Sequence, residues 1–272
     1  MSFLKFTLIT SDDVINILKP IEFDKNIIVN NIKTFQSAFI HESVCQYLKT
    51  IQDTDVPSNL KDLYGLQSYE RLEFLGDSFM QWHAGLFVFM KYPDKDPGFL
   101  TTSRINMVNK RALNIFATKL GLKKFLCLIP DEKHPHVSEK IYSDIFESFL
   151  GSLVSVFGNS NEPGNFLLNV FSRFVTQELL EDDCNYKSQL LKYYHQQKWG
   201  HPQYKLVSQT KDTENGNIEF ISAVLDYTHI NIIAVGKSNK KTDSEQIASL
   251  NALLALEAVE IPTKMKNYDI TM

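Results

Sequence analysis

Residues 69–78 read Tyr-Glu-Arg-Leu-Glu-Phe-Leu-Gly-Asp-Ser, and two of their acids, Glu73 and Asp77, stand at positions i and i+4. Side chains at that spacing lie one turn apart on the same face of an α-helix. Two carboxylates on one helix face can point toward the same ion. The spacing therefore suits a metal site.

A second pair of acids, Asp144 and Glu147, follows at i, i+3 within residues 141–150, a run that is otherwise rich in apolar side chains. Such a run predicts a packed helix. Four carboxylates on two buried helices need cations between them, and Mg²⁺ prefers oxygen ligands. The candidate catalytic and metal-binding residues are Glu73, Asp77, Asp144 and Glu147.

A lone pair of acids at helical spacing is more often the solvated face of a helix than a metal site. The neighbours argue against that interpretation here, because both pairs stand among large apolar residues. These neighbours are Leu72, Phe74 and Leu75 in the first segment and Ile145, Phe146 and Phe149 in the second. The acids are therefore expected to lie at the edge of a core.

The composition bounds the class of protein. The 272 residues carry a net charge of −4 with 43% hydrophobic residues, which is ordinary for one large or two modest packed domains. A chain with this net charge cannot attract a nucleic acid through its overall composition. Any contact with phosphates must come from local basic patches or from bound metal. Three widely spaced cysteines fit neither a disulfide framework nor a zinc ligand pair and indicate a reducing compartment.

The same sequence gives no sign of a membrane partner. Its N-terminal segment has no secretory signal pattern, and its most apolar window, 79–90, is shorter than the roughly 18 residues that a membrane span needs. We expect an intracellular, soluble protein, in either the nucleus or the cytosol.

The first two thirds of the chain read as all-α, over residues 12–182. Apolar residues recur at helical spacing in 14–18, 27–41, 70–90, 101–120 and 141–156. Pro97-Gly98 and Pro163-Gly164 suggest turns, and the polar stretch 48–68 suggests a surface loop. Glu181-Asp182-Asp183 is the best candidate for a linker, because the pattern changes beyond it.

Residues 185–260 predict a second domain with the order α-β-β-β-α. The expected helices are 186–198 and 243–259, and the expected strands are 204–209, 218–225 and 230–235. Asn215-Gly216-Asn217 stands where a hairpin turn is needed.

The decapeptide at 69–78, with its downstream Asp-x-x-Glu, resembles the signature of the ribonuclease III family. Residues 38–43, 98–109 and 120–122 are similar to further segments of that family, so the resemblance covers most of the chain. It implies a multidomain α and α+β protein, with an all-α ribonuclease III domain before an α-β-β-β-α double-stranded-RNA-binding domain.

The resemblance also implies an activity. The four carboxylates would hold Mg²⁺, which Mn²⁺ is expected to replace, for hydrolysis of both strands of double-stranded RNA to 5′-phosphate and short 3′-overhang ends. Two divalent ions about 4 Å apart can activate water, stabilise the transition state and assist the leaving oxygen. A homodimer is expected, since the family joins two active centres across one RNA-binding valley.

Two further residues match the signature. Glu70 corresponds to an acid near the RNA and the active centre, although an acid that favours the start of the helix is an equal interpretation. Phe74 corresponds to an aromatic that enters a socket on the partner subunit; the alternative is an ordinary core residue. Pro97 replaces an acid that lines this socket in relatives, and Asp96 precedes it.

In the second domain Lys237, Lys240 and Lys241 stand just before the last helix, where lysines and a helix N-terminus suit RNA phosphates. Solvated lysines are the alternative. Leu191 replaces a Gln that often meets the minor groove, and residues 185–260 hold eight lysines against eight acids. The RNA affinity of this domain is therefore expected to be weak.

Two other functions stay open at this point. One is a non-catalytic or ribosome-associated relative that binds duplex RNA, although such a protein would be expected to lose its carboxylates first. The other is a scaffold subunit of a larger processing complex.

Overall fold

The computed structural model describes residues 6–51, 58–129, 137–181, 185–211 and 218–258. It divides into two compact units, Met1–Asp182 (unit 1) and Asp183–Met272 (unit 2). Each unit has its own core, and the expected all-α and α-β-β-β-α fold classes are both confirmed. Among the described residues, no helix has the length and apolar content to cross a bilayer.

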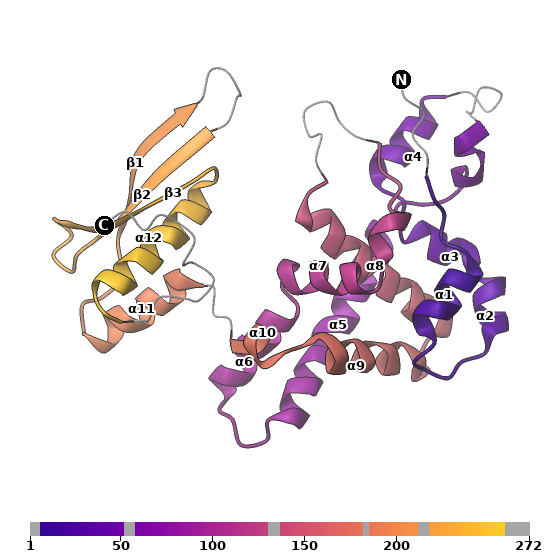
Figure 1. Ribbon diagram of the computed structural model, residues 1–272, viewed down its shortest axis with the longest axis horizontal. Helices are drawn as coiled ribbons and strands as arrows, with labels where there is room; N and C mark the ends of the chain where they lie inside the picture. Colours follow the sequence, from indigo (N-terminus) through magenta and orange to yellow (C-terminus); the bar gives the residue numbers. More distant parts are fainter. Residues whose placement is uncertain (1–5, 52–57, 130–136, 182–184, 212–217, 259–272) are drawn as a thin grey trace. The chain divides into compact units, whose positions relative to one another are not determined.

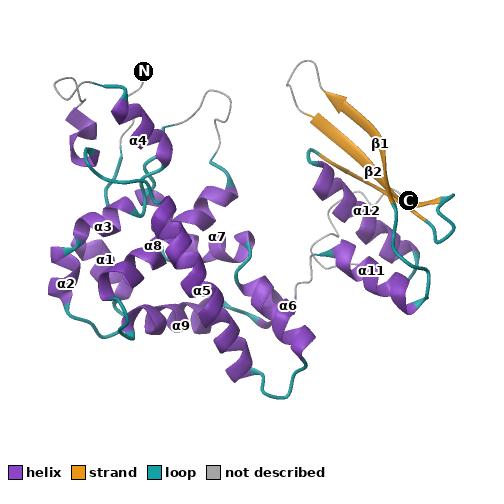
Figure 2. Cartoon of the chain, turned by 180° about the vertical axis from the view of Figure 1, so that it is seen from behind, coloured by secondary structure: helices purple, strands orange, loops and turns teal. Residues whose placement is uncertain are grey.

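Unit 1 is built around two adjacent helices, α5 (Glu70–Lys91) and α8 (Glu139–Phe157), which lie at its centre in Figures 1 and 2. The buried stretch of α8, from Ser143 to Leu153, forms the middle of the core. The surrounding helices are α1 (Ser11–Leu18), α2 (Lys25–Asn30), α3 (Ile32–Ser37), α4 (Glu42–Lys49), α6 (Pro97–Met107), α7 (Lys110–Lys119), α9 (Glu162–Phe174) and α10 (Gln177–Glu181), with short 3-10 helices η2 (Ser58–Leu63) and η3 (Leu122–Phe125).

The backbones of α5 and α8 touch where they cross. A Cβ atom added at Gly76 would overlap the carbonyl group of Glu147, and one added at Gly151 would overlap that of Leu72. Only glycine permits helices to approach this closely. The crossing therefore brings the turn that carries Glu73 next to the turn that carries Glu147.

A short extended segment fixes the start of α5. The Ile40 carbonyl accepts a hydrogen bond from the Tyr69 N–H at 2.9 Å, and the His41 N–H donates to Cys127 at 2.9 Å. Ile40 also forms a parallel bridge with Cys127. These backbone bonds join three distant parts of the chain at the residue that precedes α5.

Unit 2 consists of α11 (Tyr186–Gln196), strands β1 (Tyr204–Lys211), β2 (Ile218–Leu225) and β3 (Ile232–Ser238), and α12 (Lys241–Ala255). The sheet is antiparallel in the order β1-β2-β3. Its core joins Leu190 and Tyr194 of α11 to Val224 of β2 and Ala248 of α12. The Tyr194 hydroxyl donates to the Leu225 carbonyl at 2.7 Å, which ties α11 to the sheet.

Several expected elements of unit 1 are wrong in detail. The run 101–120 is two helices, because Asn109 caps α7 by accepting a hydrogen bond from the Ala112 N–H at 2.9 Å. Residues 27–41 likewise contain two helices rather than one, and α4 was not anticipated.

The two proline pairs do not mark turns. Pro97 begins α6, and Pro163-Gly164 lies inside the first turn of α9. A proline fits there because the first turn needs no N–H donor. Asp182 and Asp183 of the expected linker, and the expected turn at 215–217, lie outside the described residues.

The helix crossing predicts a sharp difference between two glycines of α5. Gly76→Ala should destabilise unit 1 by about 3 kcal/mol or more, because the added methyl meets rigid backbone. Gly85→Ala, whose Cβ would lie 3.6 Å from the Arg104 side chain, should stabilise the helix by about 1 kcal/mol. Calorimetric unfolding of both variants checks this, and equal effects would contradict the close crossing.

Candidate functional site

Three of the four expected carboxylates meet at the helix crossing. Ligand oxygens of Glu73 on α5 and of Asp144 and Glu147 on α8 all lie within 4.8 Å of one another. Asp144 is buried, with 4% of its surface exposed, and the other two are half-buried. This group (the acid cluster) offers oxygen donors alone.

Asp77 lies one turn further along α5 and is outside the acid cluster. Its Oδ1 accepts a hydrogen bond from Gln81 Nε2 at 3.2 Å. Gln81 in turn accepts one from Arg104 of α6 at 2.7 Å, so the orientation of Asp77 is set by a neighbouring helix. The charge of Asp77 still contributes to raising the pKa of Glu147. The structure thus places Asp77 beside the cluster rather than in it.

The surroundings of the acid cluster raise the pKa values of Glu73 and Glu147. Burial, followed by the charges of Asp77, Glu73 and Asp144, raises the pKa of Glu147 to about 8. Burial and the charge of Asp144 also raise the pKa of Glu73. Carboxyl groups that are shielded from water and close to one another resist full ionisation, because burial and like charges both disfavour the charged form. A bound cation would relieve both effects.

Two contacts hold Asp144, and sequence reasoning missed both. The buried Tyr69 hydroxyl donates to its Oδ2 at 3.5 Å, and the Lys140 ammonium lies 3.3 Å from the same oxygen. Asp144 in turn raises the pKa of Lys140. Only the second contact had a signal in the sequence, since Lys140 precedes Asp144 by one helical turn.

The donor set determines which metals fit. The cluster contains neither His nor Cys, so it lacks the ligands that zinc sites use. Carboxylate oxygens on rigid helices suit hard cations such as Mg²⁺ and Mn²⁺. Burial and the neighbouring carboxylates raise the pKa of Glu147, and a cation between these groups would offset that cost.

Glu70 and Phe74 lie on the exposed side of α5. Glu70 is in the first turn of the helix and is not part of the acid cluster. Phe74 is 76% exposed, so the interpretation as a core residue is wrong. Trp82 and Phe89 of the same helix are also more than half exposed, at 68% and 63%. A row of large apolar side chains therefore runs along α5.

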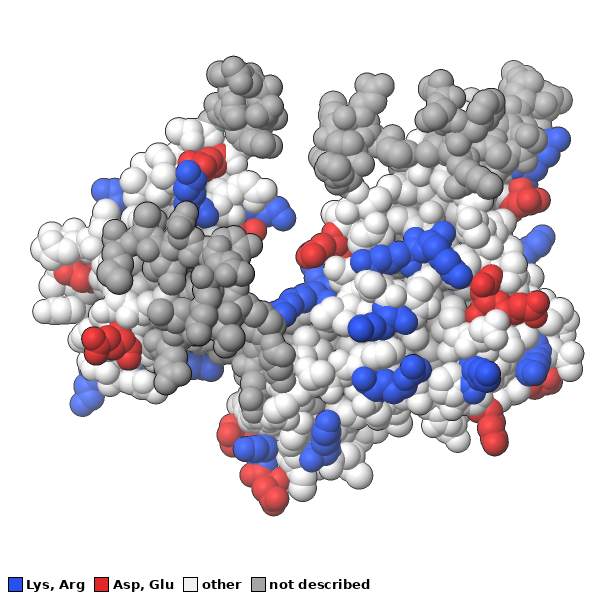
Figure 3. Space-filling view, viewed as in Figure 1, with Lys and Arg blue, Asp and Glu red and all other residues white. Residues whose placement is uncertain are grey.

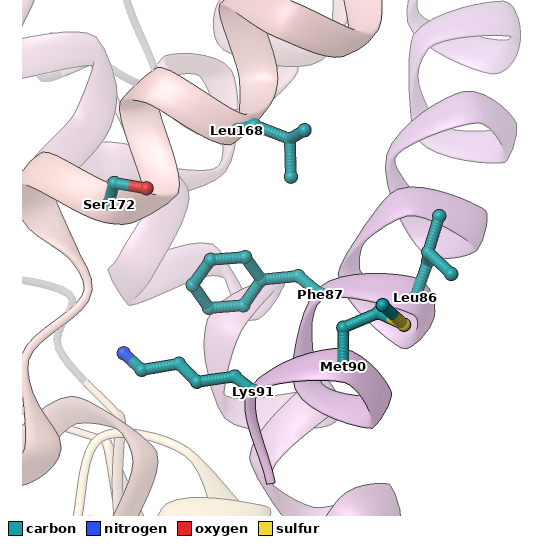
Figure 4. Close-up of a pocket in the computed structure, with 6 residues that line it drawn as sticks. All are labelled: Leu86, Phe87, Met90, Lys91, Leu168 and Ser172. Carbon is teal, nitrogen blue, oxygen red and sulfur yellow. The ribbon is translucent and has the colours of Figure 1, made fainter. Parts of the chain in front are cut away.

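The row ends beside an apolar pocket of about 470 Å³ between α5 and α9. Figure 4 shows Phe87 directed from α5 toward Leu168 and Ser172 on α9. Leu86, Met90 and Lys91 complete the lining. With no carboxylate in its lining, this pocket is unsuited to hydrolytic metal chemistry.

The three lysines of unit 2 have different surroundings. Lys237 lies in β3 and forms an ion pair with Glu219 at 2.9 Å. Lys240 is the N-cap of α12, and Lys241, its first residue, lies 3.9 Å from Glu245. The helix begins two residues earlier than expected. Within the described part of the chain Lys240 has no carboxylate partner. Of the three lysines it is therefore the one whose ammonium is most available to bind an anion.

Comparison with known proteins gives two matching family models. Residues 70–158 match the ribonuclease III domain, and residues 186–256 match the double-stranded RNA binding motif. The first match spans both helices of the acid cluster, and the second spans unit 2 from α11 to the end of α12.

Curated relatives match over both regions. Ribonuclease 3 of Staphylococcus aureus is 30% identical over 232 residues, which cover 85% of this chain and 88% of that protein. A probable ribonuclease 3 of Acanthamoeba polyphaga mimivirus is 33% identical over 196 residues, 71% of this chain, but the match spans 35% of that longer protein.

Among solved structures, the nuclease domain of ribonuclease III from Campylobacter jejuni is 20% identical, with a TM-score of 0.43, and the match covers 61% of this chain and 99% of that one. Dicer from Pichia stipitis is 24% identical, with a TM-score of 0.34, over 68% and 86% of the two chains.

The raised pKa of Glu147 predicts how stability depends on pH without metal. Between its ordinary value of 4.5 and about 8, the folded protein keeps a proton that the unfolded chain releases. The stability is therefore greatest below the lower value and is lost as pH rises toward the higher one. Glu147→Gln, which is uncharged throughout, should remove this loss.

Thermal unfolding in EDTA from about pH 5 to about pH 8 tests this sign. The melting temperature of Glu147→Gln should rise relative to wild type as pH increases. Glu139→Gln, an exposed acid at the start of the same helix, is the matched control and should show no such trend. Parallel curves for wild type and Glu147→Gln would contradict the assigned electrostatics.

Proposed function

Since this chain belongs to the ribonuclease III family, we propose that it is an endoribonuclease that hydrolyses phosphodiesters on both strands of double-stranded RNA. The resemblance drawn from the sequence is confirmed by the two domain matches and by the Staphylococcus aureus relative. The observation that carries the proposal is the acid cluster at the crossing of α5 and α8. We assign the catalytic domain to residues 12–182 and the RNA-binding domain to 185–260.

We propose Mg²⁺ as the cofactor, with Mn²⁺ as a substitute. Glu73, Asp144 and Glu147 would hold it, and Asp77 would join them from the next turn of α5. A divalent cation at such a site lowers the pKa of water and neutralises charge on the phosphate group. The all-oxygen donor set and the raised pKa of Glu147 support this assignment.

The other residues of the site position the carboxylates. Tyr69 and Lys140 both contact Oδ2 of Asp144, which leaves Oδ1 available to a cation. Gln81 and Arg104 orient Asp77 in the same manner. Groups fixed before the substrate binds need no reorganisation during the reaction. We assign Glu70 a place near the RNA, since it is exposed at the start of α5.

Unit 2 supports the choice of duplex RNA as substrate. The backbone N–H groups at the start of α12 and the ammonium of Lys240 form a local positive site on a domain that is otherwise neutral. Asp243 in the same turn opposes it. Binding by unit 2 is therefore expected to be weak, and the catalytic unit would supply part of the affinity. The products would carry 5′-phosphates and short 3′ overhangs.

We propose that the active form is a homodimer, because cleavage of both strands needs two acid clusters. The exposed apolar row on α5, which begins at Phe74, is the surface that a second copy would cover.

The structure shows what the acid next to Pro97 does in this chain. Asp96 caps α6 by accepting hydrogen bonds from the Gly98 and Phe99 N–H groups at 2.8 and 3.2 Å, so the acid serves the helix instead.

The alternative functions differ in their chemistry. A non-catalytic RNA binder, or a ribosome-associated relative, would have no need for carboxylates held at an electrostatic cost. The acid cluster therefore favours the enzyme. A scaffold subunit of a processing complex would require a partner chain for cleavage.

Cleavage of a labelled long duplex RNA in Mg²⁺, with the matching single strand as control, tests the proposed activity. Wild type should cut the duplex alone. Glu147→Gln should lower the rate by about a thousandfold or more, as loss of a group that stabilises transition-state charge does. Glu139→Gln, which makes the same charge change on the same helix, should cleave like wild type.

The outcomes separate the alternatives. Absence of cleavage by wild type, with duplex binding retained, would favour the non-catalytic binder. Cleavage that survives Glu147→Gln would show that the acid cluster is not the active site.

The apolar row predicts the oligomeric state. Trp82→Lys with Phe89→Lys should convert a wild-type dimer into monomers, because two buried charges oppose association. Sedimentation velocity measures this directly. Val29→Lys, at a residue of α2 that is 54% exposed, is the control and should leave the dimer intact. A monomeric wild type would contradict the proposed assembly.

A further inference from the structure

The C-terminal ends of three helices of unit 1 meet at a pocket of about 560 Å³. Lys19 is the C-cap of α1, Lys119 is the last residue of α7, and Arg173 lies in the last turn of α9. Lys124 of η3 completes a group of four cations around the pocket (the basic pocket). None of these residues belongs to the acid cluster.

The pocket is positive after its own acid is counted. Asp13 is the one carboxylate in its lining. That side chain already accepts hydrogen bonds from the Thr10 N–H and hydroxyl, and it lies 3.7 Å from Lys124. Within the described ranges, Lys19, Lys119 and Arg173 have no carboxylate partner. These three cations are exposed, and no carboxylate among the described residues pairs with them.

Helix dipoles do not account for this charge. A helix C-terminus is equivalent to roughly half a negative charge, so three of them give about −1.5. Asp13 brings the total to about −2.5, against four positive side chains. The surplus of more than one positive charge remains for a ligand.

Two of the cations are held in place by aromatic rings. The Lys124 ammonium lies 4.6 Å from the centre of the Phe125 ring, and the Arg173 guanidinium lies 5.0 Å from that of Phe174. Such contacts restrict flexible side chains before a ligand arrives. Figure 3 shows Lys and Arg side chains together on the face of unit 1 that carries α7 and α9.

We propose that the basic pocket binds phosphate groups of an RNA strand, as a contact separate from the acid cluster and from Lys240. This inference rests on the proposed function, which supplies RNA as the polyanion. The lining offers four cations against one carboxylate, and Asp13 is already engaged by Thr10 and Lys124. Contacts of this kind position a nucleic acid without reading its sequence. The pocket would lengthen the RNA footprint of a chain whose net charge is −4.

The test compares two triple variants of the full chain. Lys19→Gln, Lys119→Gln and Arg173→Gln remove the free cations of the basic pocket. Lys25→Gln, Lys61→Gln and Lys95→Gln make the same charge change at exposed sites of unit 1 outside it. Circular dichroism checks that both variants fold. Duplex RNA binding is measured in EDTA over a range of salt concentrations, so that no cleavage occurs.

The pocket variant should bind duplex RNA about tenfold more weakly than the control variant. The slope of a plot of log K against log salt concentration should also be less steep, by up to about three. Equal binding by the two variants would overturn the inference while leaving the proposed function intact. A wild type that binds no duplex RNA would overturn both.

A second arm distinguishes a strand from a small anion. Thermal unfolding of wild type and of the pocket variant is followed with inorganic phosphate and with a nucleoside monophosphate. Stabilisation of wild type alone by these ions, together with RNA binding equal to that of the control, would assign the pocket to a free phosphate and would overturn its role in RNA binding.

Discussion

The contact between the backbones of α5 and α8 at Gly76 and Gly151 is the constraint on which the rest of unit 1 depends. With no Cβ on either side, the two helices approach until the carbonyl groups of Glu147 and Leu72 occupy the space of the missing methyl groups. The acidic turns next to this crossing are then forced together. The acid cluster is thus a consequence of helix packing, and any residue larger than glycine would move its members apart.

This packing creates an electrostatic cost that the surrounding residues only partly offset. Burial and like charges raise the pKa of Glu147 to about 8, and the nearby charge of Lys140 opposes this rise only in part. A cation bound at this site would therefore reduce the cost. Functional sites commonly hold such unfavourable groupings, which the rest of the fold must support.

The distribution of charge explains how an acidic chain can bind a polyanion. Its net charge is −4, yet Lys240 and the basic pocket form separate positive regions on the two units. Local fields of this kind act over about 8 Å in physiological salt, so an opposite charge elsewhere on the surface is screened. The acid cluster itself becomes compatible with phosphate only when cations occupy it.

The sequence by itself determined the fold class, the two domains' families and the acids that form the candidate site. Spacing alone placed Asp144 and Glu147 on one packed helix, and alternation of side chains predicted three strands between two helices. These features are local, because periodicity reports which face of an element is apolar. Periodicity did not give the helix boundaries, since Asn109 and Pro163 act through the geometry of the first helical turn.

The tertiary structure alone decided which of these residues meet. It left Asp77 outside the acid cluster, hydrogen-bonded to Gln81, and it brought Tyr69, which precedes α5, to Asp144 on α8. It also gathered Lys19, Lys119 and Arg173 at one pocket. The physical reason is that such contacts depend on helix crossings and on where helices end in space. Neither is encoded in the spacing of residues along a single element.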